Sequence, residues 1–125
     1  MILVFGGAYQ GKKEFVFRTF GLTENDIEYA GGPSWVPGDK KVISGLELFI
    51  RSCAEEGLSA EEKLEGIMNN LEGKIVIIND ISQGIVPMDK VDRLWREENG
   101  RAMNLLAGRA EEVYRVFCGI ESRIK

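Results

Sequence analysis

A glycine-rich turn followed by two lysines lies near the N-terminus, at a spacing suited to phosphate binding. Residues 6–12 (GGAYQGK) satisfy the pattern G-x-x-x-x-G-K. Glycines let successive backbone N–H groups curl around an anion, the following helix directs its positive end there, and the lysine reaches the outer phosphates. The alternative is an ordinary tight turn between a strand and a helix. We predict that the nucleotide-binding residues are Gly6, Gly7, Ala8, Tyr9, Gln10, Gly11, Lys12 and Lys13.

Lys13 is the position at which this loop departs from the usual pattern. A serine or threonine there normally supplies a hydroxyl ligand to Mg²⁺. A charged ammonium has no lone pair and repels a cation. Lys13 either points into solvent as an ordinary helix residue, or takes over part of the neutralising role of the metal. In both cases metal-assisted phosphoryl transfer loses a ligand, so we assign no metal-binding residue and question a role for Mg²⁺.

Asp80 is a second residue with a chemical role to consider. It follows the most apolar segment of the chain, a β-branched run at residues 75–78. Ligands of open α/β sheets bind at the carboxyl ends of the strands. Asp80 could hold Mg²⁺ or a water there, or accept a proton, and it could equally cap a turn. We name Lys12 and Asp80 as the candidate catalytic residues.

The chain has no histidine. This removes the commonest general base, the commonest metal ligand and any phosphorylated or nucleotidylated histidine intermediate. The two cysteines, Cys53 and Cys118, lie far apart in apolar segments. We expect both to be small buried thiols in a reducing compartment.

The pattern of apolar residues predicts alternating strands and helices around these sites. A short apolar strand at residues 2–5 precedes the glycine-rich turn, and a helix runs from Gly11 to Gly21. The segment at residues 42–45 is extended or begins a helix. Further strands are expected at 27–30 and 75–78, helices at 46–53, 59–72 and 88–110, and a final strand with a possible hairpin at 112–125. We predict an α/β, P-loop NTPase-like fold, a mostly parallel sheet with helices on both faces.

Length and charge limit the possible classes of protein. A chain of 125 residues with 44% hydrophobic content predicts one domain, spanning residues 1–125, with a single core. The net charge of −4 argues against binding to nucleic acid. No apolar run reaches the ~20 residues of a membrane helix, and the N-terminus lacks the basic region of a signal peptide. We therefore expect a cytoplasmic protein without a membrane span.

Three segments resemble the bifunctional adenosylcobinamide kinase/adenosylcobinamide-phosphate guanylyltransferases of cobalamin synthesis. The family pattern L-V-x-G-G-A-R-S-G-K-S is similar to LVFGGAYQGKK at residues 3–13. NDISQGIVP at 79–87 resembles N-E-x-G-x-G-I-V-P, and AEEVYRVFCGIESRIK at 110–125 resembles the family's C-terminal segment. The resemblance covers about the first twenty and the last fifty residues. It implies a P-loop fold, GTP or ATP as cofactor, cobinamide as a possible second ligand, and a homo-oligomer, namely a trimer assembled partly through the long helix.

Several departures from the family pattern concern its catalytic groups. The resemblance implies guanylyl transfer through a covalent histidine, but the segment bearing that histidine is missing and residues 31–41 cross the gap. Lys13 replaces the loop serine, and Asp80 replaces a glutamate. Residues 44–47 (SGLE) correspond to an acidic residue followed by C-L-T, so that Ser44 replaces a carboxylate associated with Mg²⁺.

These departures lead to three hypotheses about function. The first is a nucleotide-binding relative of the kinase/guanylyltransferases whose guanylyl transfer is lost and whose kinase activity is in doubt. The second is a non-enzymatic nucleotide-binding protein that acts as a regulator or as a partner of a complete enzyme. The third hypothesis is that the glycine turn is only a structural turn and that the chain binds no nucleotide.

Overall fold

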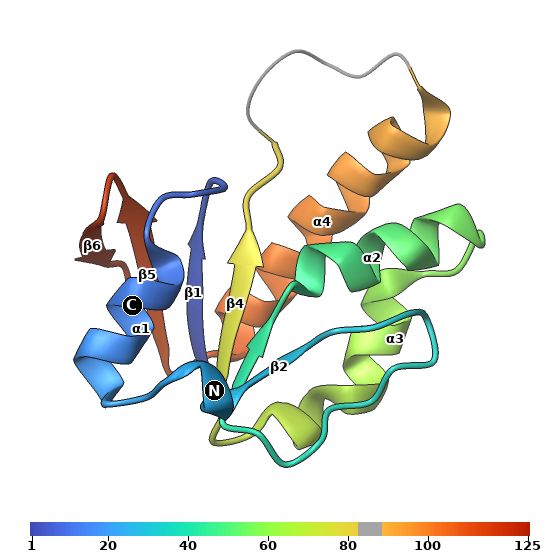
Figure 1. Cartoon of the computed structure of the whole chain (residues 1–125). Coiled ribbons are helices and arrows are strands. Elements are labelled where there is room, and N and C mark those ends of the chain that lie inside the picture. Colours follow the sequence, from blue (N-terminus) through green and yellow to red (C-terminus); the bar gives the residue numbers. More distant parts are fainter. Residues whose placement is uncertain (83–88) are drawn as a thin grey trace.

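The computed structural model describes residues 1–82 and 89–125, which form a six-stranded sheet with helices on both faces (Figure 1). The strands are β1 (Ile2–Gly6), β2 (Ile27–Tyr29), β3 (Val42–Ser44), β4 (Ile75–Asn79), β5 (Glu112–Phe117) and β6 (Ile120–Arg123). The helices are α1 (Lys12–Phe20), α2 (Leu46–Glu55), α3 (Ala60–Ile67) and α4 (Lys90–Arg109), with short 3₁₀ turns at Glu24–Asp26 and Met68–Leu71.

The strand order is β2-β3-β4-β1-β5-β6. Every neighbouring pair from β2 to β5 is parallel, and only β6 runs antiparallel to its neighbour β5. β1 lies inside this sheet and leads directly into the glycine-rich turn. The protein therefore has the predicted α/β, P-loop NTPase-like fold, and the predicted C-terminal hairpin is also confirmed.

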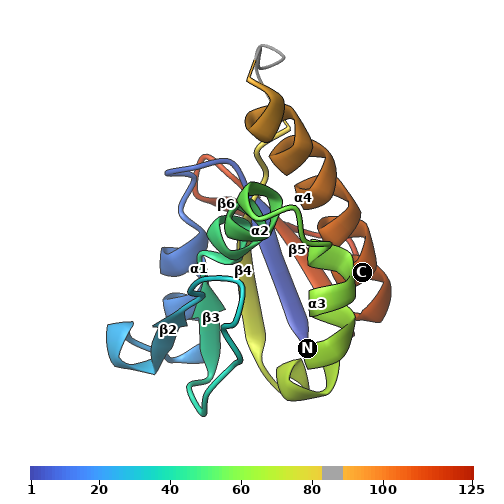
Figure 2. The same ribbon diagram turned by 90° about the vertical axis from the view of Figure 1, so that its right-hand side faces the viewer.

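Two apolar layers cover the two faces of the sheet. Successive strand residues such as Leu3 and Val4 point to opposite faces, as the pleat requires, and belong to different core clusters. On one face α1 contributes Phe15 and Val16 to the core. The other face carries α2, α3 and α4, which contact one another as Figure 2 shows. The carboxyl ends of the central strands are left open between these layers.

Four sequence predictions need adjustment. The helix expected at 59–72 ends at Ile67 and is followed by the 3₁₀ turn at Met68–Leu71. The ambiguous segment at 42–45 is a strand that ends at Ser44, and the strand expected at 27–30 ends at Tyr29. The long helix begins at Lys90, because Asp89 caps it by accepting hydrogen bonds from the N–H groups of the first turn. Residues 83–88, which carry the GIVP part of the family resemblance, lie outside the described residues. Among the described helices, none is long and apolar enough to cross a membrane.

The prediction that both cysteines are buried is wrong for Cys118. Cys53 is buried in α2, and burial raises the pKa of its thiol. Cys118 is exposed, because it occupies the tip of the β5–β6 hairpin with Gly119, both at positive φ (51° and 76°). Two positive φ values are what a tight two-residue hairpin turn requires. The apolar residues around Cys118 belong to strands of the hairpin, whose side chains alternate between two faces, and they do not indicate that Cys118 is buried.

Gly6 is required at the end of β1 because no side chain fits there. A Cβ atom at this position would lie 2.3 Å from the carbonyl oxygen of Val116 in β5. We expect Gly6→Ala to lower the free energy of unfolding by about 2 kcal/mol or more, since backbone of the neighbouring strand must move. Urea denaturation measures this change. Gly100→Ala is the matched control: its Cβ meets nothing within 4 Å, and alanine should stabilise α4 by up to ~1 kcal/mol. Equal stability of Gly6→Ala and wild type would contradict the prediction.

Candidate functional site

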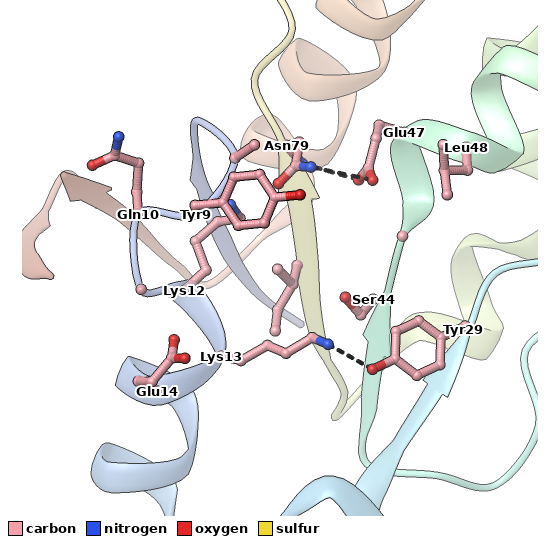
Figure 3. Close-up of a pocket in the computed structure, with 14 residues that line it drawn as sticks. Tyr9, Gln10, Lys12, Lys13, Glu14, Tyr29, Ser44, Glu47, Leu48 and Asn79 are labelled. Atoms are coloured by element: carbon pink, nitrogen blue, oxygen red, sulfur yellow. Dashed lines mark hydrogen bonds between the residues drawn. The ribbon is translucent and has the colours of Figure 1, made fainter. Parts of the chain in front are cut away.

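A cavity of about 430 Å³ opens at the carboxyl ends of β1, β3 and β4 (Figure 3). This volume lies within the range of small-molecule sites, roughly 300–1,000 Å³. The cavity is enclosed by the glycine-rich loop and the start of α1 on one side, and by β2, β3 and the start of α2 on the other. It is lined by Ala8, Tyr9, Gln10, Gly11, Lys12, Lys13, Glu14, Tyr29, Ser44, Gly45, Glu47, Leu48, Ile77 and Asn79.

The backbone of the loop offers a set of hydrogen-bond donors to this cavity. Within residues 1–82 and 89–125, no protein acceptor is found for the N–H groups of Ala8, Tyr9 and residues 11–14, and these six residues line the cavity. Gly11 precedes α1 in the left-handed conformation (φ 93°), and no side chain caps the helix. The first N–H groups of a helix are the natural binding site for an anion. This arrangement of the loop and helix start is compatible with an anion, and phosphate binding stays a prediction.

Lys12 is turned inward across the loop. Only 7% of the residue is exposed, and its Nζ donates a hydrogen bond to the carbonyl oxygen of Gly7 at 2.6 Å. Burial lowers the pKa of Lys12, while the carboxylates of Glu47 and Glu14 partly offset that effect. Burial has removed much of the water that would stabilise the Lys12 ammonium. An anion bound beside it would stabilise the charged form instead, so the buried lysine favours anion binding.

Lys13 also takes part in the cavity, which excludes the interpretation that it only faces solvent. Its Nζ donates a hydrogen bond to the Tyr29 hydroxyl at 2.6 Å and lies 3.8 Å from a carboxylate oxygen of Glu24. The hydrogen bond to Tyr29 is the main reason that the pKa of Lys13 is raised. The side chain extends from α1 toward β2 below Ser44 (Figure 3). A permanent positive charge thus lies in the cavity next to the loop.

Glu47 is the acidic residue of the site that sequence analysis did not select. It is 7% exposed, lies in the first turn of α2, and accepts hydrogen bonds from the backbone N–H of Asn79 (3.0 Å) and from its side-chain Nδ2 (3.4 Å). A signal was present in the sequence: Glu47 shares the buried stripe of α2 with Ile50 and Ala54. A carboxylate on an otherwise apolar stripe indicates a site.

Two side chains of α4 support the cavity from behind. The Trp95 Nε1 donates to the carbonyl oxygen of Glu47 at 2.7 Å, and the Nδ2 of the buried Asn99 donates to the carbonyl oxygen of Asn79 at 3.0 Å. These bonds fix the start of α2 and the end of β4 relative to each other. The long helix therefore positions Glu47 and Asn79 without reaching the cavity itself.

Asp80 occupies a turn, which was the alternative role considered for it. Its Oδ1 accepts hydrogen bonds from the backbone N–H of Ser82 (2.9 Å) and from the Ser82 hydroxyl (2.5 Å). The residue that lines the cavity at the end of β4 is its neighbour Asn79. The structure thus places residues 8–13 of the predicted site, including Lys12, in the lining of the cavity, and it leaves Gly6, Gly7 and Asp80 outside that lining.

The residues present fit a phosphate group better than a metal ion. Mg²⁺ prefers an octahedral set of oxygen ligands, usually with one or two carboxylates. Lys13 and Ser44 stand at the two positions where the family resemblance places a hydroxyl and a carboxylate. Within the described ranges 1–82 and 89–125, no group of three or more cysteines, aspartates and glutamates could hold a metal ion. The carboxylates of Glu14 and Glu47 also line the cavity, but its hydrogen-bond donors, two ammonium groups and backbone N–H groups, match an anion.

A sequence family described as cobinamide kinase / cobinamide phosphate guanyltransferase matches residues 43–124. This match extends from β3 to the end of the hairpin and covers well over half of the chain. The chain belongs to this family. The match begins after the glycine-rich loop, so the case for phosphate binding at residues 6–13 rests on the pattern and geometry of the loop itself.

A curated relative supports the family assignment, although less than half of that relative is aligned. The bifunctional adenosylcobalamin biosynthesis protein CobU of Escherichia coli strain K12 is 34% identical over 73 residues. The aligned part is 57% of this chain and 40% of the relative. The chain therefore spans about 40% of the length of the relative it matches. A shared family and fold do not by themselves show that this chain has the activity of the whole relative.

Proposed function

We propose that this chain binds GTP or ATP, with the triphosphate held in the cavity by the glycine-rich loop and the two lysines. Among the described residues, the observation that supports this proposal best is that two ammonium groups and six backbone N–H groups without a protein acceptor belong to residues that line one cavity. A triphosphate supplies the acceptors that these donors lack. Lys12 exchanges its bond to the Gly7 carbonyl for phosphate oxygens, and the helix dipole of α1 adds to the attraction.

Guanylyl transfer is not part of the proposed function. The route that the family resemblance implies passes through a covalent histidine, and the chain contains none. The other nucleophiles near the loop do not replace it: Lys12 and Lys13 are held as ammonium donors by the Gly7 carbonyl and the Tyr29 hydroxyl, and a protonated amine is no nucleophile.

A cobinamide kinase is the second candidate function, and a binding protein without turnover is the one we favour. Phosphoryl transfer depends on neutralising charge at the transferred group, for which enzymes of this fold use Mg²⁺. Lys13 and Ser44 remove two of the expected metal ligands. The observation that favours a kinase is the buried Glu47, because its carboxylate lies in the cavity and carboxylates are ligands of Mg²⁺. In our proposal the chain acts as a nucleotide-responsive regulator or as a partner of a complete enzyme.

Calorimetric titration with GTP, ATP and GDP, each with and without Mg²⁺, tests the proposal. We expect binding of at least one triphosphate with an affinity that Mg²⁺ hardly changes, and no labelled phosphate or guanylyl group on cobinamide. Binding that requires Mg²⁺, together with phosphate transfer to cobinamide, would instead establish the kinase. Absence of binding by all three nucleotides would leave the glycine turn as a structural element only.

A further inference from the structure

The tip of the C-terminal hairpin contacts the glycine-rich loop. The backbone N–H of Cys118 donates to the side-chain Oε1 of Gln10 at 2.6 Å, although the two residues are 108 positions apart in the sequence. The N–H of Gly119 donates to the backbone carbonyl oxygen of Gln10 at 2.8 Å. The turn between β5 and β6 lies beside the loop that follows β1 in both views (Figures 1 and 2). Gln10 is therefore bonded to the hairpin tip through its side chain and through its backbone.

The hairpin also lies close to the loop at both of its ends. A Cβ atom at Gly11 would lie 3.2 Å from the Cα of Gly119, and a Cβ atom at Gly6 would lie 2.3 Å from the carbonyl oxygen of Val116. Gly6 ends β1 and Gly11 precedes α1. Glycine allows two backbones to approach this closely. The hairpin thus contacts the loop where it begins, at Gln10 and where it ends.

Tyr9 shows why the loop needs support from outside. It adopts a positive φ (58°), which costs free energy in a residue that carries a side chain. Such a conformation persists only where the surrounding structure holds it. The Tyr9 side chain is fully exposed, so its packing does not hold the backbone. The next residue, Gln10, is held by its two bonds to the hairpin tip.

The hairpin does not need these two bonds for its own fold. Its ladder closes with the pair of Phe117 and Ile120, and the turn residues Cys118 and Gly119 lie outside that ladder. The positive φ values of the two turn residues already produce the chain reversal. Their N–H groups still require acceptors or water. The bonds to Gln10 therefore restrain the loop more than they stabilise the hairpin.

We propose that Gln10 is a positioning residue and that the hairpin tip keeps the glycine-rich loop in the conformation that binds phosphate. The proposal rests on the proposed function, because it concerns how the nucleotide site is held. The side-chain amide of Gln10 points away from the cavity (Figure 3), so it acts through the loop and not by contact with the ligand. Since coupling between two equilibria is reciprocal, a bound nucleotide must in turn strengthen the bonds at the hairpin tip.

Gln10→Met tests the link between the loop and the hairpin. Methionine has a similar length but lacks the oxygen that accepts from Cys118. The loss of one hydrogen bond should lower the affinity for ATP or GTP, measured by calorimetric titration, by about three- to tenfold. Glu61→Met removes a polar group from the exposed surface of α3 and is the control, which should bind like wild type. Thermal melts should show that both variants are folded.

Hydrogen exchange at the hairpin tip, followed by NMR, gives a readout that a purely structural role of Gln10 would not change. In wild type, ATP or GTP should slow exchange of the Cys118 and Gly119 N–H groups by the same factor of about three to ten, because the coupling is reciprocal. In Gln10→Met the slowing at Cys118 should be much smaller. The N–H of Lys63, which donates to the Ser59 carbonyl oxygen in α3 at 3.2 Å, is the control and should keep its rate.

The outcomes separate this proposal from the proposed function. A wild-type protein that binds neither ATP nor GTP would overturn both. Nucleotide binding by wild type with equal affinity in Gln10→Met would overturn the positioning role alone. A weaker Gln10→Met whose tip amides respond to nucleotide as in wild type would also overturn it, because Gln10 would then contact the ligand directly. Equal slowing at Lys63 and at the hairpin tip would indicate stabilisation of the whole fold and would contradict a specific link.

Discussion

Replacing Lys12 with alanine is expected to weaken GTP or ATP binding by about 100-fold. The lysine is the buried cation of the loop, and a hydrogen bond between charged partners contributes about 1.5–3 kcal/mol. Its ammonium donates a hydrogen bond to the Gly7 carbonyl oxygen, which phosphate oxygens can replace. Calorimetric titration gives the affinity. A thermal melt shows whether the variant folds, and we expect little change, since the variant also removes the cost of burying an ammonium.

Two measurements separate this role of Lys12 from a structural one. Lys63→Ala removes an exposed lysine of α3 and should leave affinity unchanged. Since burial lowers the pKa of Lys12, the ammonium loses its proton at a lower pH than a free lysine does. Wild-type affinity should therefore fall as alkaline pH is approached, and this fall should be weaker in Lys12→Ala. Equal affinities of wild type and Lys12→Ala would show that the loop does not use its lysine for phosphate.

Sequence patterns predicted the fold well because its elements are determined by local signals. The β-branched run at 75–78 became β4, and the G-x-x-x-x-G-K spacing placed a turn between β1 and α1. Helix periodicity identified α2 and α4. The exposed tip of the hairpin at Cys118 was missed, because the need for positive φ at two successive residues is not visible in an apolar stretch of sequence.

The site was only partly predictable because its second half comes from distant parts of the chain. Tyr29 reaches Lys13 only because β2 lies beyond β3 in the sheet, and this strand order is a property of the whole fold. Glu47 meets Asn79 across 32 positions of sequence. Loop residues 6–13 carry their geometry in their own order, but the partners of Lys12 and Lys13 depend on packing.

Restoring the two missing metal ligands is expected to convert metal-independent binding into metal-dependent binding. In wild type, Mg²⁺ should change the affinity for ATP or GTP by less than about threefold, because the Lys13 ammonium already lies in the cavity and repels a cation. Lys13→Ser supplies the hydroxyl and Ser44→Asp the carboxylate that Mg²⁺ binding uses in this fold. In the double variant we expect Mg²⁺ to strengthen binding at least about tenfold, measured by titration with and without EDTA.

The single variants show which property of Lys13 matters. Lys13→Ala removes the charge without providing a ligand, so it should weaken binding and leave it insensitive to Mg²⁺. Tyr29→Phe keeps the ammonium but removes the hydroxyl that holds it, and should weaken binding less than Lys13→Ala does. A wild-type protein that already needs Mg²⁺ would contradict the idea that Lys13 substitutes for the metal. A folded double variant that binds nucleotide equally well with and without Mg²⁺ would contradict the assignment of positions 13 and 44 as the lost ligand positions.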